Sequence, residues 1–175
     1  MFSLRSLTTV FATAALVLLT ACGGSEAKKT NAMAKTVEDY FPIKIGDQTV
    51  RLQIAALPAE QQHGLMFRKA MDADAGMIFV FTSPQQMGFW MRNTTLPLDI
   101  GYLDTSGELK EIYPMYPLDE RSVASRSHSI QFCLEMNQGW YKANGVKPGA
   151  KLDLKALAEA LKARGLKPEA AGLPR

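Results

Sequence analysis

The chain has 175 residues and a formal net charge of +3, and this length suits one domain with its own hydrophobic core. So mild a positive charge gives no reason to expect a nucleic acid as partner. Two cysteines are too few for a disulfide framework, which excludes the small disulfide-stabilised secreted domains.

The first 21 residues predict a lipoprotein signal peptide. Arg5 supplies a positive start, and an uncharged apolar run from Leu7 to Leu19 follows it. This run ends in Leu19-Thr20-Ala21-Cys22, which resembles the bacterial lipoprotein cleavage box, where the cysteine is lipidated and becomes the first mature residue. The alternatives are ordinary secretion and an uncleaved anchor. We expect an exported protein held at the membrane through lipidated Cys22, facing the periplasm at the outer membrane because Gly23 rather than an acid follows.

The mature chain should begin with a tether. Removal of residues 1–21 takes away only Arg5, so the formal charge falls from +3 to +2. Residues 22–39 are small and polar, which favours a flexible tether ahead of a domain that starts near residue 40. If Cys22 is acylated, Cys133 has no disulfide partner, and the fold must hold by packing alone.

The domain opens with patterns typical of strands. Phe41–Ile45 and Val50–Ile54 alternate apolar and polar residues on either side of a turn, which predicts a hairpin. Pro58 and Gly64 suit the start and the C-terminal cap of a short helix. The continuous apolar run Met77–Phe81 predicts a strand that is covered on both faces.

The stretch from Phe89 to Asp99 is the most unusual in the chain. An apolar strand over Phe89–Arg92 runs directly into charged and hydrogen-bonding side chains, which are costly there unless they are paired or contact a ligand. In an extended backbone Phe89 and Met91 share one face, whereas Trp90 and Arg92 share the other. We expect the first pair to pack in the core. The indole and guanidinium should face an opening, where they suit stacking on a sugar or binding a carboxylate.

The rest of the chain predicts more short strands and one helix. Strands are expected over 98–103, 108–112 and 129–136, a surface loop over 113–127, and a short helix with a loose tail over 155–175. Many short strands with few helices predict a mainly β domain over residues 40–154. We expect a small rolled sheet or partly closed barrel with one or two short helices.

Several motifs occur in an order that is specific as a set. They are Gly64-Leu65-Met66-Phe67-Arg68, Gly76–Phe81, Phe89–Thr94 with Pro97-Leu98-Asp99, and Leu134-Glu135 followed by Gly139, Gly145-Val146 and Pro148-Gly149. Over about residues 41–154 the chain strongly resembles domain-of-unknown-function family 192. The resemblance implies a compact β domain, often exported, with no established biochemical activity, and it carries over no catalytic residues. Ala150 departs from the family pattern, because members often have an acid after that glycine.

The candidate ligand-binding residues combine aromatic, amide, hydroxyl and charged side chains: Arg68, Trp90, Arg92, Asn93, Thr94, Asp99 and Glu135. Those from position 90 to 99 are close enough in sequence to line one opening, whereas Arg68 and Glu135 would have to be brought there by the fold. The alternative is structural: the two arginines and two acids form buried ion pairs that close the barrel.

The sequence favours a lipid-anchored envelope protein that acts as a non-catalytic binding or accessory module for a small polar ligand, a glycan or a partner protein. The first alternative is an enzyme acting on cell-wall glycan, with Asp99 and Glu135 as an acid/base pair. A lesser alternative is Cu(I) binding by thioethers with His63, as in His63-Gly64-Leu65-Met66. The sequence has no phosphate-binding glycine loop, zinc-type Cys/His pair or serine elbow, so no cofactor and no resident metal are predicted.

Overall fold

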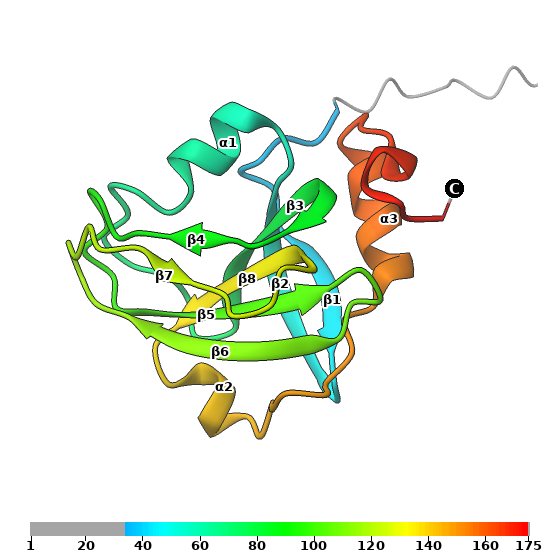
Figure 1. The fold of residues 1–175 in the computed structure, drawn as a ribbon. Coiled ribbons are helices and arrows are strands. Elements are labelled where there is room, and N and C mark those ends of the chain that lie inside the picture. Colours follow the sequence, from blue (N-terminus) through cyan, green and yellow to red (C-terminus); the bar gives the residue numbers. More distant parts are fainter. Residues whose placement is uncertain (1–33, 175) are drawn as a thin grey trace, which may run out of the picture. The chain divides into compact units, whose positions relative to one another are not determined.

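The structure is a computed structural model and describes residues 34–174. The expected signal peptide, Cys22 and most of the expected tether lie outside these residues. The elements are β1 (Phe41–Ile45), β2 (Gln48–Ala55), α1 (Pro58–His63), β3 (Ala75–Gln85), β4 (Gly88–Phe89), β5 (Leu98–Asp104), β6 (Leu109–Met115), β7 (Val123–Ala124), β8 (Ile130–Asn137), α2 (Trp140–Ala143), α3 (Leu154–Ala163) and the 3-10 helix η1 (Pro168–Ala171) (Figure 1).

Six strands form one mixed sheet in the order β1-β2-β3-β8-β5-β6, and β4 pairs with β7 in a separate two-stranded ribbon. Within the sheet, β2 and β3 are parallel and the other neighbours are antiparallel. A parallel pair needs a crossover connection, and α1 lies in it. The predicted mainly β class is confirmed. The six strands do not close into a barrel.

Both faces of the sheet are covered, as the apolar run in β3 predicts. Ile78 and Val80 belong to one core cluster, which includes buried residues of α2 and α3, and we name this side the helix face. Met77 and Phe79 belong to a second cluster, which includes buried residues of the segment 87–96, and we name this side the loop face. Alternation of side chains along each strand therefore decides which of two different environments a residue enters.

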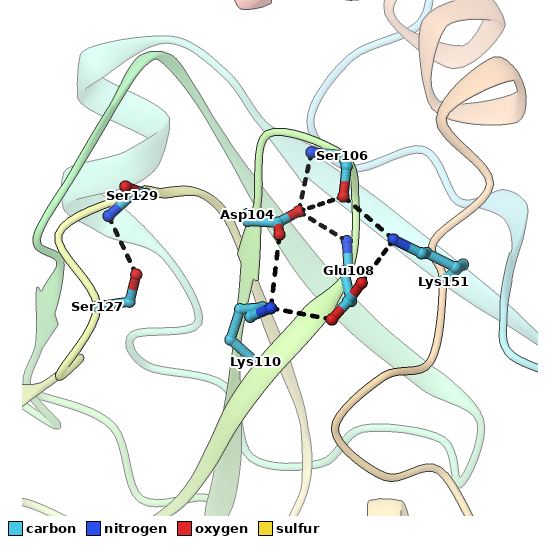
Figure 2. A network of polar contacts seen from close by, with 7 residues as sticks. All are labelled: Asp104, Ser106, Glu108, Lys110, Ser127, Ser129 and Lys151. Atoms are coloured by element: carbon cyan, nitrogen blue, oxygen red, sulfur yellow. Dashed lines mark hydrogen bonds and ion pairs between the residues drawn. The ribbon is translucent and has the colours of Figure 1, made fainter.

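The segment 149–153 ties together the two edges of the open sheet at one end. The Lys151 carbonyl accepts a hydrogen bond from the Gly46 backbone N–H beyond β1, at 2.9 Å. The Lys151 ammonium contacts Glu108 Oε2 at 2.8 Å and Ser106 Oγ at 3.1 Å, in the turn between β5 and β6 (Figure 2). These contacts cover the ends of both edge strands, which the open sheet would otherwise expose.

Two predictions in the middle of the chain need correction. Of the expected strand over residues 89–92, only Phe89 is in a strand, at the end of β4, and the backbone then turns at Asn93, whose φ is +55°. The expected loop over 113–127 is partly ordered as strand, since β6 extends to Met115 and β7 pairs with β4.

The C-terminal region is more ordered than predicted. The expected helix is confirmed as α3, which buries Leu157 and Leu161 against the helix face. The prediction of a loose tail after it is wrong: η1 follows, and Leu173 is 5% exposed within the core cluster. The short helix α2, which the sequence analysis did not predict, buries Trp140 and Tyr141.

The start of the described chain also contacts the domain, because the Lys35 backbone N–H donates to the Ala163 carbonyl at 3.2 Å. Among residues 34–174, the helices are all too short or too polar to cross a membrane.

Candidate functional site

A pocket of about 150 Å³ lies on the loop face, and we name it the Glu135 pocket. Glu135 belongs to the central strand β8 and forms its base. Apolar and aromatic side chains make much of its wall, namely Leu65, Met66, Phe79, Phe89 and Trp90. A wider hollow of about 360 Å³ adjoins it, shares Met66 and Trp90, and adds Arg92 and Asn93.

The short helix α1 supplies one side of the pocket. Glu60 fixes the start of the helix, because its Oε2 accepts the backbone N–H groups of Ala56 and Leu57, each at 3.0 Å. The helix stops at Gly64, whose φ of +50° suits a residue without a side chain. A Cβ there would lie 3.3 Å from the Phe79 ring, so this glycine also allows the close approach of the pocket wall. His63, the last helical residue, therefore lines the pocket.

Three loops join beside the pocket through backbone hydrogen bonds. The carbonyl of Asn93 accepts from Phe67 at 2.8 Å, and that of Thr94 accepts from Leu118 at 3.0 Å. Phe67, Asn93 and Leu118 have φ values of 64°, 55° and 61°, and within residues 34–174 no other residue except glycine has a positive φ. Left-handed backbone is unfavourable for bulky side chains, so the backbone strain of the domain is concentrated at this junction.

Trp90 and Arg92 take the exposed positions that alternation predicts. The Trp90 side chain is 45% exposed, and the Arg92 guanidinium carbon lies 5.6 Å from the centre of its ring. Met91 between them is 1% exposed. Phe89 packs edge-on against Phe79, with ring centres 4.8 Å apart. The expected partition therefore holds for Met91 in the core and for Trp90 and Arg92 outside it, whereas Phe89 is only partly buried and also lines the pocket.

Glu135 is the most unusual group in the pocket. It is 4% exposed, and among residues 34–174 no hydrogen bond or ion pair reaches its carboxyl group. Burial raises its pKa to about 8, so the carboxyl is mainly protonated at neutral pH. A buried polar group without a partner is costly and rare. In its protonated form it can donate one hydrogen bond and accept others.

The other predicted acid, Asp99, lies on the helix face. Asp99 is paired in register with Met136, whereas Glu135 is opposite Ile100, so the two carboxyls point to opposite sides of the sheet. Asp99 Oδ2 accepts the Gly139 backbone N–H at 2.8 Å. Burial raises the pKa of Asp99, and this hydrogen bond partly opposes the shift. The predicted acid/base pair of Asp99 and Glu135 is therefore wrong, because one substrate bond cannot lie between them.

Arg68 also lies outside the pocket. Its guanidinium is 3.6 Å from Glu38 and 3.3 Å from the Tyr40 hydroxyl. The predicted set thus divides in three: Trp90, Thr94 and Glu135 line the pocket, Arg92 and Asn93 line the adjoining hollow, and Arg68 and Asp99 lie elsewhere. The predicted ion pairs among the two arginines and two acids are wrong, since none of the four contacts another of the set.

Sequence reasoning missed the contribution of Gln61 and Gln62 of α1 and of Phe79 of β3 to the pocket, and it considered His63 and Met66 only as copper ligands. The start and stop of α1 could be predicted, but not the side of the sheet on which it lies. The one deeply buried ion pair of the described chain, between Glu60 and Arg164, was also missed. It joins α1 to the end of α3, and no local pattern indicates a partner 104 residues away.

Soft metal ligands are sparse at this site. His63 and Met66 both line the pocket, but Met77 and Met91 are buried in the core cluster of the loop face. Within residues 34–174 no three His, Cys, Asp or Glu side chains lie close enough to hold a metal ion. Two such ligands give little support to the Cu(I) alternative.

Comparison with known proteins agrees with the resemblance. Residues 41–154 match the DUF192 family, which is described as "Uncharacterized ACR". A putative transcription regulator from Sinorhizobium meliloti 1021 is 29% identical over 68% of this chain and 96% of its own, with a TM-score of 0.64. A protein of unknown function from Novosphingobium aromaticivorans DSM 12444 is 33% identical over 65% of this chain and 84% of its own, with a TM-score of 0.62. No curated protein matches the chain.

Proposed function

Because the chain belongs to the DUF192 family, whose description assigns no activity, we propose a function from its own site: a non-catalytic module that binds a small polar ligand in the Glu135 pocket. The observation that carries this proposal is the carboxyl of Glu135, buried at the base of a pocket without a partner from the described residues. A ligand that forms a hydrogen bond or an ion pair with this group would offset the cost of burying it.

The size of the pocket sets the scale of what enters. A volume of about 150 Å³ is well above the roughly 10–15 Å³ that a single water needs, so the pocket has room for several water-sized groups. This suits a small molecule or the end of a larger glycan or peptide. The remainder of a larger ligand would lie in the adjoining hollow, where Trp90 offers an exposed indole and Arg92 a guanidinium.

The proposal leaves out catalysis for a geometric reason. Glycoside hydrolysis uses two carboxyl groups on either side of one bond. Of the two acids that the sequence suggested, only Glu135 faces the pocket, because Asp99 faces the other side of the sheet. One protonated carboxyl beside aromatic rings supports recognition better than it supports turnover.

The binding proposal is tested by titrating isotope-labelled protein with small sugars, amides, amines and carboxylates while recording amide chemical shifts. We expect at least one class to cause saturable shifts at the Glu135 pocket. The variant Trp90→Ala should weaken this binding at least tenfold. The control Tyr116→Ala removes another exposed aromatic side chain that does not line the pocket, and it should bind as the wild type does. Absence of saturable shifts with every class would refute the proposal.

We also propose that the domain is anchored in the cell envelope through a lipidated Cys22, facing the periplasm at the outer membrane. The apolar run and the Leu19-Thr20-Ala21-Cys22 box support this. Cells grown with labelled palmitate should label the wild-type chain and the control Cys133→Ser, but not Cys22→Ser. Membrane fractionation should then place the labelled chain in the outer membrane. An unlabelled wild-type chain would contradict the anchor, and labelled chain in the inner membrane would contradict the location.

A further inference from the structure

The charge of the Glu135 pocket is unbalanced. Among the described residues that line it, Glu135 has the one carboxyl group, and neither lysine nor arginine is present. Arg92, the nearby cation, lines the adjoining hollow and lies over the Trp90 ring instead. If the carboxyl ionises, no lysine or arginine among the described residues that line the pocket can neutralise its charge.

The walls of the pocket have the chemistry that attracts cations. Phe79, Phe89 and Trp90 contribute three aromatic rings, and ring faces attract organic cations through their quadrupoles. Met66 adds a polarizable thioether to the same wall. Trp90 already has one cation over its ring, since the Arg92 guanidinium carbon is 5.6 Å from the ring centre.

From this combination of one unpartnered carboxyl, three aromatic rings and no internal cation, we infer that the Glu135 pocket receives an ammonium group, as a primary amine or another small organic cation. The inference rests on the proposed binding function and names the chemical class of the ligand. The ammonium forms an ion pair with Glu135 and packs its carbon atoms against the rings. A charge-assisted hydrogen bond of this kind is roughly twice as strong as one between neutral groups.

Ionisation of Glu135 makes this binding depend on pH. His63 of α1 is the other titratable residue that lines the pocket. Tyr102, Cys133 and Tyr141 interact electrostatically with Glu135, and burial raises the pKa of each of them, which keeps them neutral. Because burial also raises the pKa of Glu135 to about 8, the carboxyl must lose a proton before it pairs. Affinity for an amine should therefore rise about tenfold per pH unit between pH 6 and 7 and level off above pH 8.

Three probes of equal length but different charge test the inference: n-butylammonium, 1-butanol and butyrate. Each is titrated into labelled protein at pH 6, 7 and 8, and the dissociation constant is taken from chemical shifts at the pocket. At pH 8 we expect butylammonium to bind at least tenfold more tightly than butanol, and butyrate more weakly than either. Aliphatic amines stay charged over this range, as lysine does at about pKa 10.4, so the pH dependence reports the protein.

Two variants identify the group that is responsible. Glu135→Gln keeps the size of the side chain and should remove both the preference for butylammonium and its pH dependence. His128→Gln is the matched control, because it replaces an exposed histidine that does not line the pocket, and it should keep both. Survival of the preference for butylammonium and of its pH dependence in Glu135→Gln would overturn the inference.

The outcomes separate this inference from the function on which it rests. Equal or tighter binding of butanol or butyrate overturns the ammonium assignment and leaves the binding function standing. If the three probes fail to bind but sugars or amides bind at the pocket, the ammonium assignment is also overturned and the binding function is kept. If no probe of any class causes saturable shifts, both proposals fall.

Discussion

The two faces of the sheet treat their buried carboxyl groups differently. On the helix face, Asp99 is 9% exposed and accepts a backbone hydrogen bond from Gly139 at 2.8 Å. Glu60, which joins α1 to α3, is paired with Arg164. On the loop face, Glu135 is more deeply buried, at 4% exposure, and has no partner among the described residues. The acids that hold elements together have partners within the fold, and the unpartnered Glu135 at the pocket supports the proposed binding function.

The largest expected effect is a pH-dependent difference in stability between the wild type and Glu135→Gln. The pKa of Glu135 rises from an ordinary value of 4.5 to about 8 in the folded protein. Between these values the unfolded chain binds fewer protons than the folded one, so wild-type stability falls as pH rises. We expect a loss of about 1.4 kcal/mol per pH unit relative to the variant, or about 4 kcal/mol between pH 5 and 8. Urea unfolding of both proteins at each pH measures this difference. If the free energies of unfolding of the two proteins change equally with pH, the raised pKa of Glu135 is contradicted.

The second effect comes from breaking the ion pair between Glu60 and Arg164. The side chains are 13% and 4% exposed, so Arg164→Ala leaves a nearly buried carboxylate without its main partner. We expect a loss of about 3 kcal/mol in the free energy of unfolding. Lys162→Ala is the control, because its contact with Glu159 is exposed, and it should change stability by less than about 0.5 kcal/mol. Similar losses of stability in the two variants would show that the buried ion pair contributes no more than the exposed one.

Two substitutions at Asp99 separate charge from hydrogen bonding on the helix face. Asp99→Asn keeps an oxygen that accepts the Gly139 N–H, so its stability should stay within about 0.5 kcal/mol of the wild type. Asp99→Ala leaves that donor without its acceptor and should cost about 1–2 kcal/mol. Thermal unfolding near neutral pH distinguishes them. Equal losses would mean that the carboxylate charge matters more than the acceptor.

The smallest expected effect on stability is that of Trp90→Ala. Its side chain is 45% exposed, so truncation should lower the free energy of unfolding by less than about 1 kcal/mol while binding at the pocket weakens at least tenfold. Chemical unfolding and the ligand titration are carried out on the same preparation. A loss above about 2 kcal/mol would instead make Trp90 a core residue and remove it from the site.

Local patterns in the sequence predict local structure well. The hairpin of β1 and β2, the limits of α1 and the buried stripe of α3 follow from spacing and caps, and alternation places Trp90 outside and Met91 inside. The site depends on pairings between distant segments, which spacing does not contain. Asp99 and Glu135 are separated by the register of β5 against β8, since Asp99 lies opposite Met136. A one-residue shift in that register would have brought both acids to the same face.

The position of β8 has a consequence for how the domain is made. This strand lies between β3 and β5, yet residues 130–137 follow both of them by more than twenty-five positions in the chain. Until residues 130–137 leave the ribosome, β1–β2–β3 and β5–β6 are two separate pieces, and each has an open edge where its shared neighbour belongs. Assembly is therefore deferred until β8 has been made, and a product truncated before residue 130 lacks the strand that unites the two halves.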